Sequence, residues 1–204
     1  INEILAPLIK KHSERFFWRT DDAHPIKSPA SIIEKILRSR EDYRKKRLKD
    51  EKPVRAYDLI NFTNEMTDLA RFRIICNFLS DVMQVAECIR RSETITSFLV
   101  ESDFKDSIRL HKRISGERSI KIILKQKKLP GLFLEIQVMT QLQEAWDKKD
   151  HYLVYEKRRS SSKCDDDNFP TYLDAKMSAM AELLYVADDY FNQLRKEEME
   201  VDAE

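Results

Sequence analysis

Glycine is almost absent from this sequence of 204 residues, which contains only Gly116 and Gly131. A chain of this length at average usage would carry about 14 glycines. Loops that bind phosphates through backbone N–H groups need glycines at fixed spacing, and neither GxxxxGKS/T nor GxGxxG occurs here. Any phosphate-bearing ligand of this protein therefore has to be held by side chains.

Cysteine is also scarce, because the chain has only Cys76, Cys88 and Cys164. They are odd in number, widely spaced and far from any paired-ligand pattern, so we expect neither a disulfide framework nor a zinc site. Proteins without disulfides are common in reducing compartments, so the sequence favours a cytoplasmic location.

Long apolar runs and an excess of one charge are missing as well. No run approaches the roughly 18 apolar residues that span a bilayer, and the N-terminus lacks the basic-then-apolar layout of a signal peptide. We expect a soluble protein with no membrane partner. The 37 basic and 36 acidic residues cancel, which argues against nucleic-acid binding through bulk charge, although local basic clusters remain able to bind phosphates.

The apolar periodicity predicts an α/β (α+β) fold, a mixed sheet flanked by helices with further helices at both ends of the chain. The length fits one domain, residues 1–204. Helices are predicted at 1–17, from Ser28 and Pro29 into the charged stretch that follows, from a Ser80 cap, at 141–159 and at 170–196. Strands are predicted from Asp68 to Phe78, at 96–100, 119–125 and 132–140, and a Pro-Gly turn of hairpin length joins the last two.

The last predicted helix carries apolar residues at alternating steps of four and three, which is the spacing of a coiled-coil seam. The seam comprises Leu173, Met177, Met180, Leu184, Ala187, Phe191 and Leu194. Such a seam packs on the domain itself or on a second chain. A homo-oligomer through the C-terminal helices is therefore one expectation.

A single carboxylate, Glu135, interrupts the apolar strand LFLEIQVMT. Side chains alternate along a strand, so Glu135 and Gln137 share the face opposite Ile136. A carboxylate there needs a cation, a metal or an open cleft, unless the strand lies at a solvated edge. Asp68 begins a second strand, and two carboxylates on neighbouring strands suit one Mg²⁺ and a phosphate-bearing substrate. This pattern indicates phosphoryl or nucleotidyl transfer.

The stretch LFLEIQVMTQLQEAWDKKDHYLVYE resembles the signature of the RelA/SpoT synthetase domain. In that family a strand motif E-I-Q-I/V-x-T is followed by a tryptophan and then by a histidine and a tyrosine on a helix. The matching residues are Glu135, Ile136, Gln137, Val138, Thr140, Trp146, His151 and Tyr155.

Three upstream segments carry further family motifs in the family's order, from about residue 25 to 156. IKSPASIIEKI resembles the helix start K-x-x-x-S-I-x-x-K through Lys27, Ser31, Ile32 and Lys35. TDLARFRIICNF resembles the strand D-I/L-A-G-x-R-I, and DSIRLHKRISGERSIKIIL resembles the acceptor loop, in which D-Y-I/V leads to G-Y-x-S-x-H. The agreement of four motifs in order makes the resemblance specific.

The resemblance implies a nucleotidyltransferase-like mixed sheet and the transfer of the β,γ-pyrophosphate of ATP to the 3′-hydroxyl of a nucleotide. By position, Asp68 and Glu135 would be the Mg²⁺ ligands and catalytic carboxylates. Lys27, Ser31 and Lys35 would bind the ATP phosphates, and the planar guanidinium of Arg73 would stack on the adenine.

The resemblance also implies the residues around the acceptor. Gln137 would orient it, and the basic pair His111 and Lys112 would neighbour its site. The remaining acceptor-binding positions are Glu117, Ser119, Lys121 and His151. Trp146 and Tyr155 are interpreted as packing residues.

The sequence departs from the family pattern around the phosphates and the acceptor. Pro25 and Met139 occupy positions of family arginines, the loop glycine opposite Arg71 is absent, and Lys121 takes the place of a histidine. Glu117 stands where a tyrosine would stack on guanine, a contact worth about 1 to 3 kcal/mol per base. The acceptor is then GDP or GTP held differently, an adenine nucleotide, or the 3′ end of tRNA. Two alternatives are a non-catalytic regulator that keeps the fold and an unrelated Mg²⁺-dependent nucleotidyltransferase.

Overall fold

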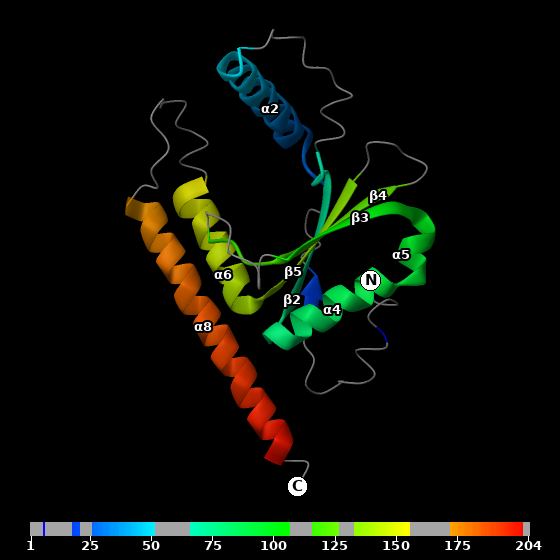
Figure 1. Ribbon diagram of the computed structural model, residues 1–204, viewed down its shortest axis with the longest axis vertical. Helices are drawn as coiled ribbons and strands as arrows, with labels where there is room; N and C mark the ends of the chain where they lie inside the picture. Colours follow the sequence, from blue (N-terminus) through cyan, green and yellow to red (C-terminus); the bar gives the residue numbers. More distant parts are fainter. Residues whose placement is uncertain are drawn as a thin grey trace.

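A computed structural model describes residues 6, 18–20, 26–51, 66–106, 116–126, 133–155 and 172–201. Its centre is a five-stranded mixed sheet with the strand order β1-β2-β5-β4-β3 (Figure 1). The strands are β1 Trp18–Thr20, β2 Ala70–Cys76, β3 Leu99–Asp106, β4 Ile120–Gln126 and β5 Phe133–Thr140. The central pair β2 and β5 is parallel, and the other pairs are antiparallel. The predicted mixed sheet flanked by helices is confirmed.

The helices of the described residues are α2 Pro29–Lys49, α4 Leu79–Arg91, α5 Glu93–Phe98, α6 Gln141–Asp150, the π-helical turn η1 His151–Tyr155, and α8 Tyr172–Val201. The predicted N-terminal helix falls almost entirely outside the described residues, as do the Pro-Gly turn and Cys164. Within the described part of the chain, no helix is both long enough and apolar enough to cross a membrane. Neither Cys76 nor Cys88 takes part in a disulfide bond in the described part of the chain.

Two predicted elements were placed wrongly. The strand expected at residues 96–100 starts only at Leu99, because residues before it complete α5. Helix α4 begins at Leu79, and Phe78 at its N-cap makes no side-chain hydrogen bond, so Ser80 is not the cap. The Ser80 backbone N–H instead donates to Asn192 Oδ1 at 3.1 Å.

One face of the sheet packs against α4 and forms the main core. The core side chains of the strands include Ile74, Ile122, Ile136 and Val138, each 1% exposed or less. Helix α4 presents apolar residues every three or four positions, and this spacing gathers them on its sheet-facing side. They are Val82, Val85, Ala86 and Ile89.

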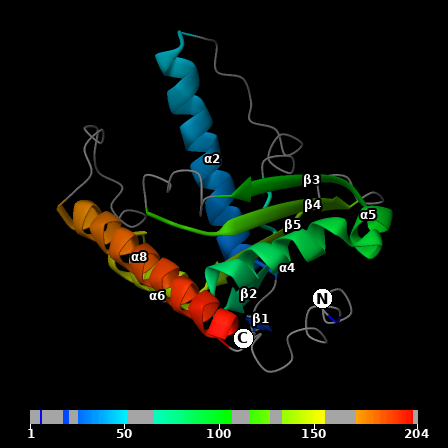
Figure 2. The same ribbon diagram turned by 60° about the horizontal axis from the view of Figure 1, so that its bottom comes forward.

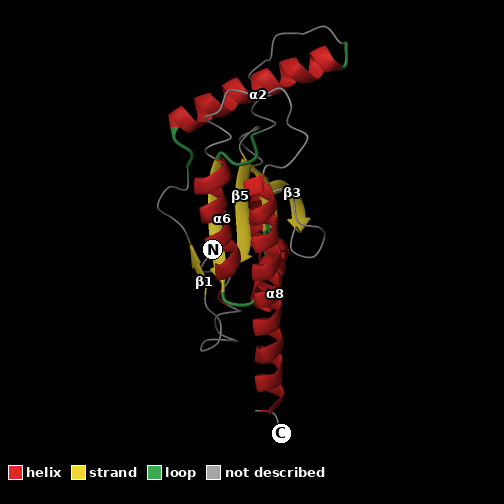
Figure 3. Ribbon diagram, turned by 90° about the vertical axis from the view of Figure 1, so that its left-hand side faces the viewer, coloured by secondary structure: helices red, strands yellow, loops and turns green. Residues whose placement is uncertain are grey.

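Helices α6 and α8 lie side by side and share a second, smaller core (Figure 3). The Trp146 indole is 2% exposed, packs with Val154, Met177 and Ala181, and donates from Nε1 to the Met177 carbonyl at 2.8 Å. The packing role predicted for Trp146 is thus confirmed.

The seam predicted on α8 packs on the domain only in part. The buried residues of α8 are Met177, Ala181, Asp188 and Asn192, whereas Met180, Phe191 and Leu194 are exposed. The reason is that two polar side chains find partners on the packed face. Asp188 accepts from the Thr140 hydroxyl at 2.5 Å and from Gln143 Nε2 at 3.3 Å. Assembly through the exposed apolar residues of this helix stays a prediction.

Helix α2 extends away from the sheet, on the side opposite α4 (Figure 2). It begins as predicted, with Ser28 accepting from the Ser31 backbone N–H at 3.3 Å and proline in the first turn. None of its 21 residues is buried, and the ion pairs of Lys27 and Lys35 with Asp68 attach its N-terminal end to the described domain.

Candidate active site

Alternation along the strands gives the sheet a second face with polar side chains on its central strands. Register pairs Arg71 with Glu135 and Arg73 with Gln137 across β2 and β5, and Lys121 with Gln137 across β4 and β5. Residues paired by register point to the same side of a sheet. The polar side chains predicted from the sequence on β2, β4 and β5 therefore share one face, opposite α4.

Asp68 lies in the turn before β2 and joins this sheet to α2. An antiparallel bridge between Ile26 and Ala70, and a hydrogen bond of 3.0 Å from the Lys27 N–H to the Leu69 carbonyl, bring the two segments together. The amines of Lys27 and Lys35 each form an ion pair with a different oxygen of the Asp68 carboxylate. Three predicted site residues from two separate motifs thus converge on one point.

The electrostatics of this triad keep Asp68 ionised. Partial burial alone would raise the pKa of the Asp68 carboxyl, but the hydrogen bonds and charges of Lys27 and Lys35 outweigh it and hold the pKa at about 2. Burial lowers the pKa of Lys27, the charges of Lys35 and Arg71 add to that effect, and Asp68 opposes it. Two ammonium groups around one carboxylate leave a net positive charge, which suits a polyanionic ligand.

Glu135 lies in the middle of β5, on the polar face, and only 7% of it is exposed. Its neighbours by register are Arg71 on β2 and Ile123 on β4. Glu135 and the ionised Asp68 offer carboxylate oxygens, which are the ligands Mg²⁺ prefers. Among the described residues, no group of three or more histidine, cysteine or acidic side chains is placed to hold a metal. Two carboxylates are a donor set for a hard cation that keeps several waters as its other ligands.

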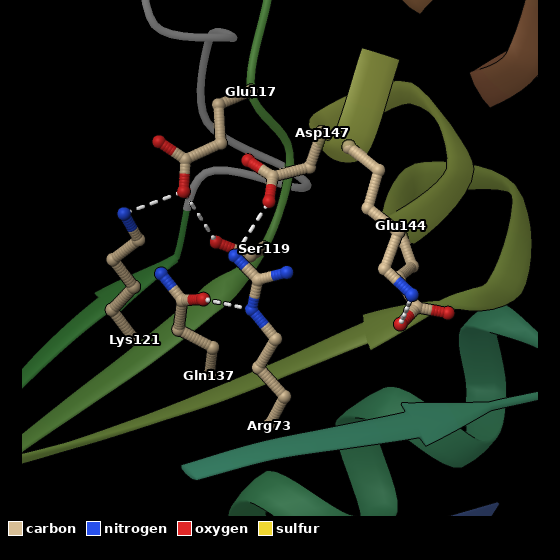
Figure 4. A network of polar contacts seen from close by, with 8 residues as sticks. Arg73, Glu117, Ser119, Lys121, Gln137, Glu144 and Asp147 are labelled. Atoms are coloured by element: carbon tan, nitrogen blue, oxygen red, sulfur yellow. Dashed lines mark hydrogen bonds and ion pairs between the residues drawn. The ribbon is translucent and has the colours of Figure 1, made fainter. Parts of the chain in front are cut away.

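Arg73 is fixed at the centre of the polar face by two neighbours. Its Nε donates to Gln137 Oε1 at 3.0 Å, and its Nη2 donates to Asp147 Oδ2 at 2.6 Å (Figure 4). Sequence reasoning missed Asp147, which lies on α6 two turns beyond the end of β5. Its place directly after the motif tryptophan is the signal that marks it.

The two unusual residues of the acceptor motif pair with each other. The Lys121 amine lies 2.5 Å from Glu117 Oε1, and the Ser119 hydroxyl donates to the same oxygen at 3.2 Å (Figure 4). The side chains of Glu117 and Lys121 are only 15% and 10% exposed. Glu117 and Lys121 therefore act as one unit, an ion pair in place of the family's tyrosine and histidine.

The other predicted site residues are less closely connected. Ser31 is half-buried near the start of α2, where its hydroxyl accepts from Ser28 Oγ at 3.0 Å, and His151 is exposed on η1. Met139, which occupies the position of a family arginine, is fully buried on β5. His111, Lys112 and Pro25 lie outside the described residues, and so does the Tyr155 side chain.

Comparison with known proteins agrees with this architecture. The family described as "Region found in RelA / SpoT proteins" matches residues 24–160. The GTP pyrophosphokinase YwaC of Bacillus subtilis (strain 168) is 25% identical over 177 residues, which cover 84% of this chain and 71% of that protein.

Solved structures show the same fold. Small alarmone synthetase 1 from Bacillus subtilis, bound to its product pppGpp, superposes with a TM-score of 0.60 at 21% identity and covers 97% of this chain and 88% of its own. A GTP pyrophosphokinase family protein from Streptococcus pneumoniae gives a TM-score of 0.63 at 19% identity, with 98% and 87% covered.

Proposed function

Because the chain belongs to the RelA/SpoT family, we propose that it is a Mg²⁺-dependent pyrophosphokinase, which transfers the β,γ-pyrophosphate of ATP to the 3′-hydroxyl of a nucleotide acceptor. The observation that carries this proposal is the convergence of Lys27 and Lys35 on Asp68 at the edge of the polar face. A surplus of positive charge beside an ionised carboxylate is the environment that a metal-bound triphosphate needs.

On the ATP side, Asp68 and Glu135 are the proposed ligands of one Mg²⁺, which would neutralise phosphate charge and polarise the bond that breaks. Lys27 and Lys35, which pair with Asp68 here, would bind the phosphate oxygens, and Ser31 would add a hydroxyl near the helix start. Arg73 uses the edges of its guanidinium for Gln137 and Asp147. Hydrogen bonds at the edges leave the planar face suited to stacking on the adenine.

On the acceptor side, Glu117, Ser119 and Lys121 form a carboxylate, hydroxyl and ammonium group on the same polar face as Gln137. Such a set recognises a base through hydrogen bonds at its edge, whereas the family's tyrosine recognises it by stacking. His151, His111 and Lys112 remain proposed acceptor contacts. Three acceptors carry the required ribose 3′-hydroxyl: guanine nucleotides, adenine nucleotides and the 3′ end of tRNA. A transfer assay distinguishes among them.

The test is incubation of the protein with γ-labelled ATP and Mg²⁺ against GDP, GTP, AMP, ADP, ATP and deacylated tRNA. We expect label on one acceptor class, loss of product with a chelator, and loss of product in Asp68→Asn. The matched control is Asp42→Asn, which neutralises an exposed acid on α2 and should retain activity.

Two results would contradict the proposal. Transfer by Asp68→Asn at the wild-type rate would remove the metal assignment. Binding of ATP with no transfer to any acceptor would instead support the non-catalytic regulator. That alternative is favoured by one observation, the replacement of the stacking tyrosine by Glu117 in an internal ion pair.

A further inference from the structure

The short segment that leads into β4 is held between two helices. Gly116 has a φ of +89°, and a Cβ at this position would lie 2.9 Å from Trp146 Cζ2 on α6 and 3.0 Å from Ala181 Cβ on α8. Only glycine combines this backbone conformation with such a close approach. The chain therefore enters β4 at a point fixed by both α6 and α8.

Arg118, two residues later, makes a second attachment to α8. Its Nη2 lies 2.9 Å and 2.8 Å from the two oxygens of Glu182, and its guanidinium carbon lies 4.1 Å from the centre of the Tyr185 ring. The Arg118 side chain is 8% exposed. A charged group so deeply packed, with an ion pair on its edge and an aromatic ring on its face, has little freedom to move.

Arg118 lies in the chain between two residues of the acceptor cluster, which comprises Glu117, Ser119 and Lys121. Glu117 precedes it and Ser119 follows it, and both belong to the cluster with Lys121 on the polar face. Because the backbone links them directly, a displacement of Arg118 moves Glu117 and Ser119 with it. The contacts to α8 thus fix the position of the hydrogen-bonding groups on the acceptor side.

We propose that Arg118 is a positioning residue for the acceptor site, and that Glu182 and Tyr185 of α8 are the support it uses. The expected effect on acceptor KM rests on the proposed function, because that proposal identifies Glu117, Ser119 and Lys121 as the acceptor site. Helix α8 lies beyond residues 24–160, the range that the family matches. The acceptor site of this chain is then completed by a helix outside the family region.

The chain supplies a matched control at the other end of α8. Arg195 Nη1 donates to Asp81 Oδ1 at 2.6 Å, and its guanidinium carbon lies 4.5 Å from the Phe78 ring centre. The chemistry is the same as at Arg118, an arginine between a carboxylate and an aromatic ring. Arg195 attaches α8 to the start of α4, where its partners are Ser80, Asp81 and Phe78, so its loss tests for a general weakening of α8.

The experiment compares Arg118→Met with Arg195→Met in steady-state kinetics, with ATP and with the acceptor that the labelling panel identifies. We expect Arg118→Met to raise the acceptor KM about tenfold, equivalent to about 1.4 kcal/mol, and to leave the ATP KM within about twofold of wild type. Arg195→Met should leave the acceptor KM unchanged, although it removes the arginine partner of a carboxylate that is 1% exposed. The exchange Arg118→Glu with Glu182→Arg should restore part of the acceptor affinity.

A second readout does not depend on activity. Brief acetylation followed by mass spectrometry measures the reactivity of the Lys121 amine, which is 10% exposed beside Glu117. Arg118→Met should raise Lys121 labelling several-fold and leave Lys27 and Lys35 as in wild type, whereas Arg195→Met should change none of the three. If no acceptor is labelled in the panel, the proposed function fails and this readout alone decides the positioning role.

Three results would overturn the inference. One is unchanged Lys121 labelling in Arg118→Met. Another is an equal rise of both KM values in that variant. The third is the same acceptor KM effect from Arg195→Met, because Arg118 would then contribute only to the general stability of α8.

Discussion

The two faces of the central sheet are made from alternate residues of the same strands and differ in character. One face is aliphatic, and the other places polar groups beside the buried side chains of Ile75, Ile123 and Met139. On the α4 side, the strands contribute aliphatic side chains that have lost nearly all contact with water. On the other side, Arg73, Lys121, Glu135 and Gln137 occupy the neighbouring positions. Burial of apolar area stabilises the fold, and a rigid backbone common to both faces holds the polar groups in place.

The sharpest way to separate the faces is a pair of substitutions at adjacent residues of β5. Glu135→Gln should reduce turnover at least about 1000-fold, or about 4 kcal/mol of transition-state stabilisation, because it removes a charged ligand of a hard cation. The free energy of unfolding should change by less than about 1 kcal/mol, since glutamine has nearly the same shape. Labelled-product assays and urea titration measure the two quantities. Turnover near the wild-type value would show that Glu135 is not a metal ligand.

The reverse result is expected one residue later. Ile136→Ala deletes core atoms of a residue that is 1% exposed, and it should lower the free energy of unfolding by about 2 to 4 kcal/mol. The ATP KM of the folded fraction should stay within about threefold of wild type, because the polar face keeps its groups. If Ile136→Ala leaves the free energy of unfolding unchanged and abolishes activity, then the assignment of stability to one face and of catalysis to the other is wrong.

The apolar face ends at a buried acid, which makes stability depend on pH. Burial raises the pKa of Asp188 to about 6, against the hydrogen bonds from Thr140 and Gln143, which lower it. Because the folded state holds the Asp188 proton more tightly than the unfolded state does, protonation of Asp188 stabilises the fold. This stabilisation is fully present below pH 3.8, the ordinary pKa of an aspartic acid, and is lost as the pH rises through about 6.

Asp188→Asn should therefore be more stable than wild type at pH 7.5, by about 1 to 3 kcal/mol, and equal to it near pH 4. The asparagine carbonyl can accept both existing hydrogen bonds, because both donors meet one oxygen of Asp188. Urea titrations at the two pH values test this. The Asp189→Asn exchange is unsuitable as a control, because Asp189 accepts a hydrogen bond from Gln193 Nε2 at 2.7 Å. Asp42→Asn on α2 serves better, and a loss of stability in Asp188→Asn at pH 7.5 would refute the prediction.

How far the sequence predicts this molecule differs between the two faces. Alternation along the strand alone assigned Ile136 and Glu135 to opposite faces. The family motifs predicted one site for Lys27, Lys35 and Asp68, and the ion pairs among these three residues agree with that prediction. The packed face of α8 was not predictable from periodicity, because its buried positions include Asp188 and Asn192, whose partners lie more than 40 residues away. A hydrophobic pattern in the sequence predicts which apolar side chains are buried. It does not predict the burial of a polar side chain whose hydrogen-bond partner is distant in the sequence.

The pairing of Glu117 with Lys121 was not predicted from the sequence. In a fully extended strand, residues four apart are separated by about 13 Å, so only nearly the full length of both side chains brings their charges together. Here β4 begins only at Ile120, and Glu117 lies in the segment before it, next to Gly116. Alternation places two side chains on the same face of a strand but does not state how far each extends, so local sequence could not indicate the contact.

The smallest expected effect concerns this ion pair, and it decides how the acceptor base is recognised. Glu117→Tyr restores the family's aromatic residue but leaves Lys121, which is 10% exposed, without its carboxylate partner. We expect the single variant to lose activity on the native acceptor and to gain no use of GDP or GTP. The reason is that the Lys121 amine would stay buried without its counter-ion, and this cost opposes the free energy gained by stacking.

The double variant Glu117→Tyr with Lys121→His removes that buried charge. Its transfer to guanine nucleotides should rise by up to about tenfold, the equivalent of about 1.4 kcal/mol of stacking. Transfer to GDP and GTP in the labelling assay measures both variants, with Lys125→His as a control on the same strand. If Glu117→Tyr alone gives strong transfer to GDP, the ion pair is incidental to acceptor choice and the base is recognised by stacking, as the family motif implies.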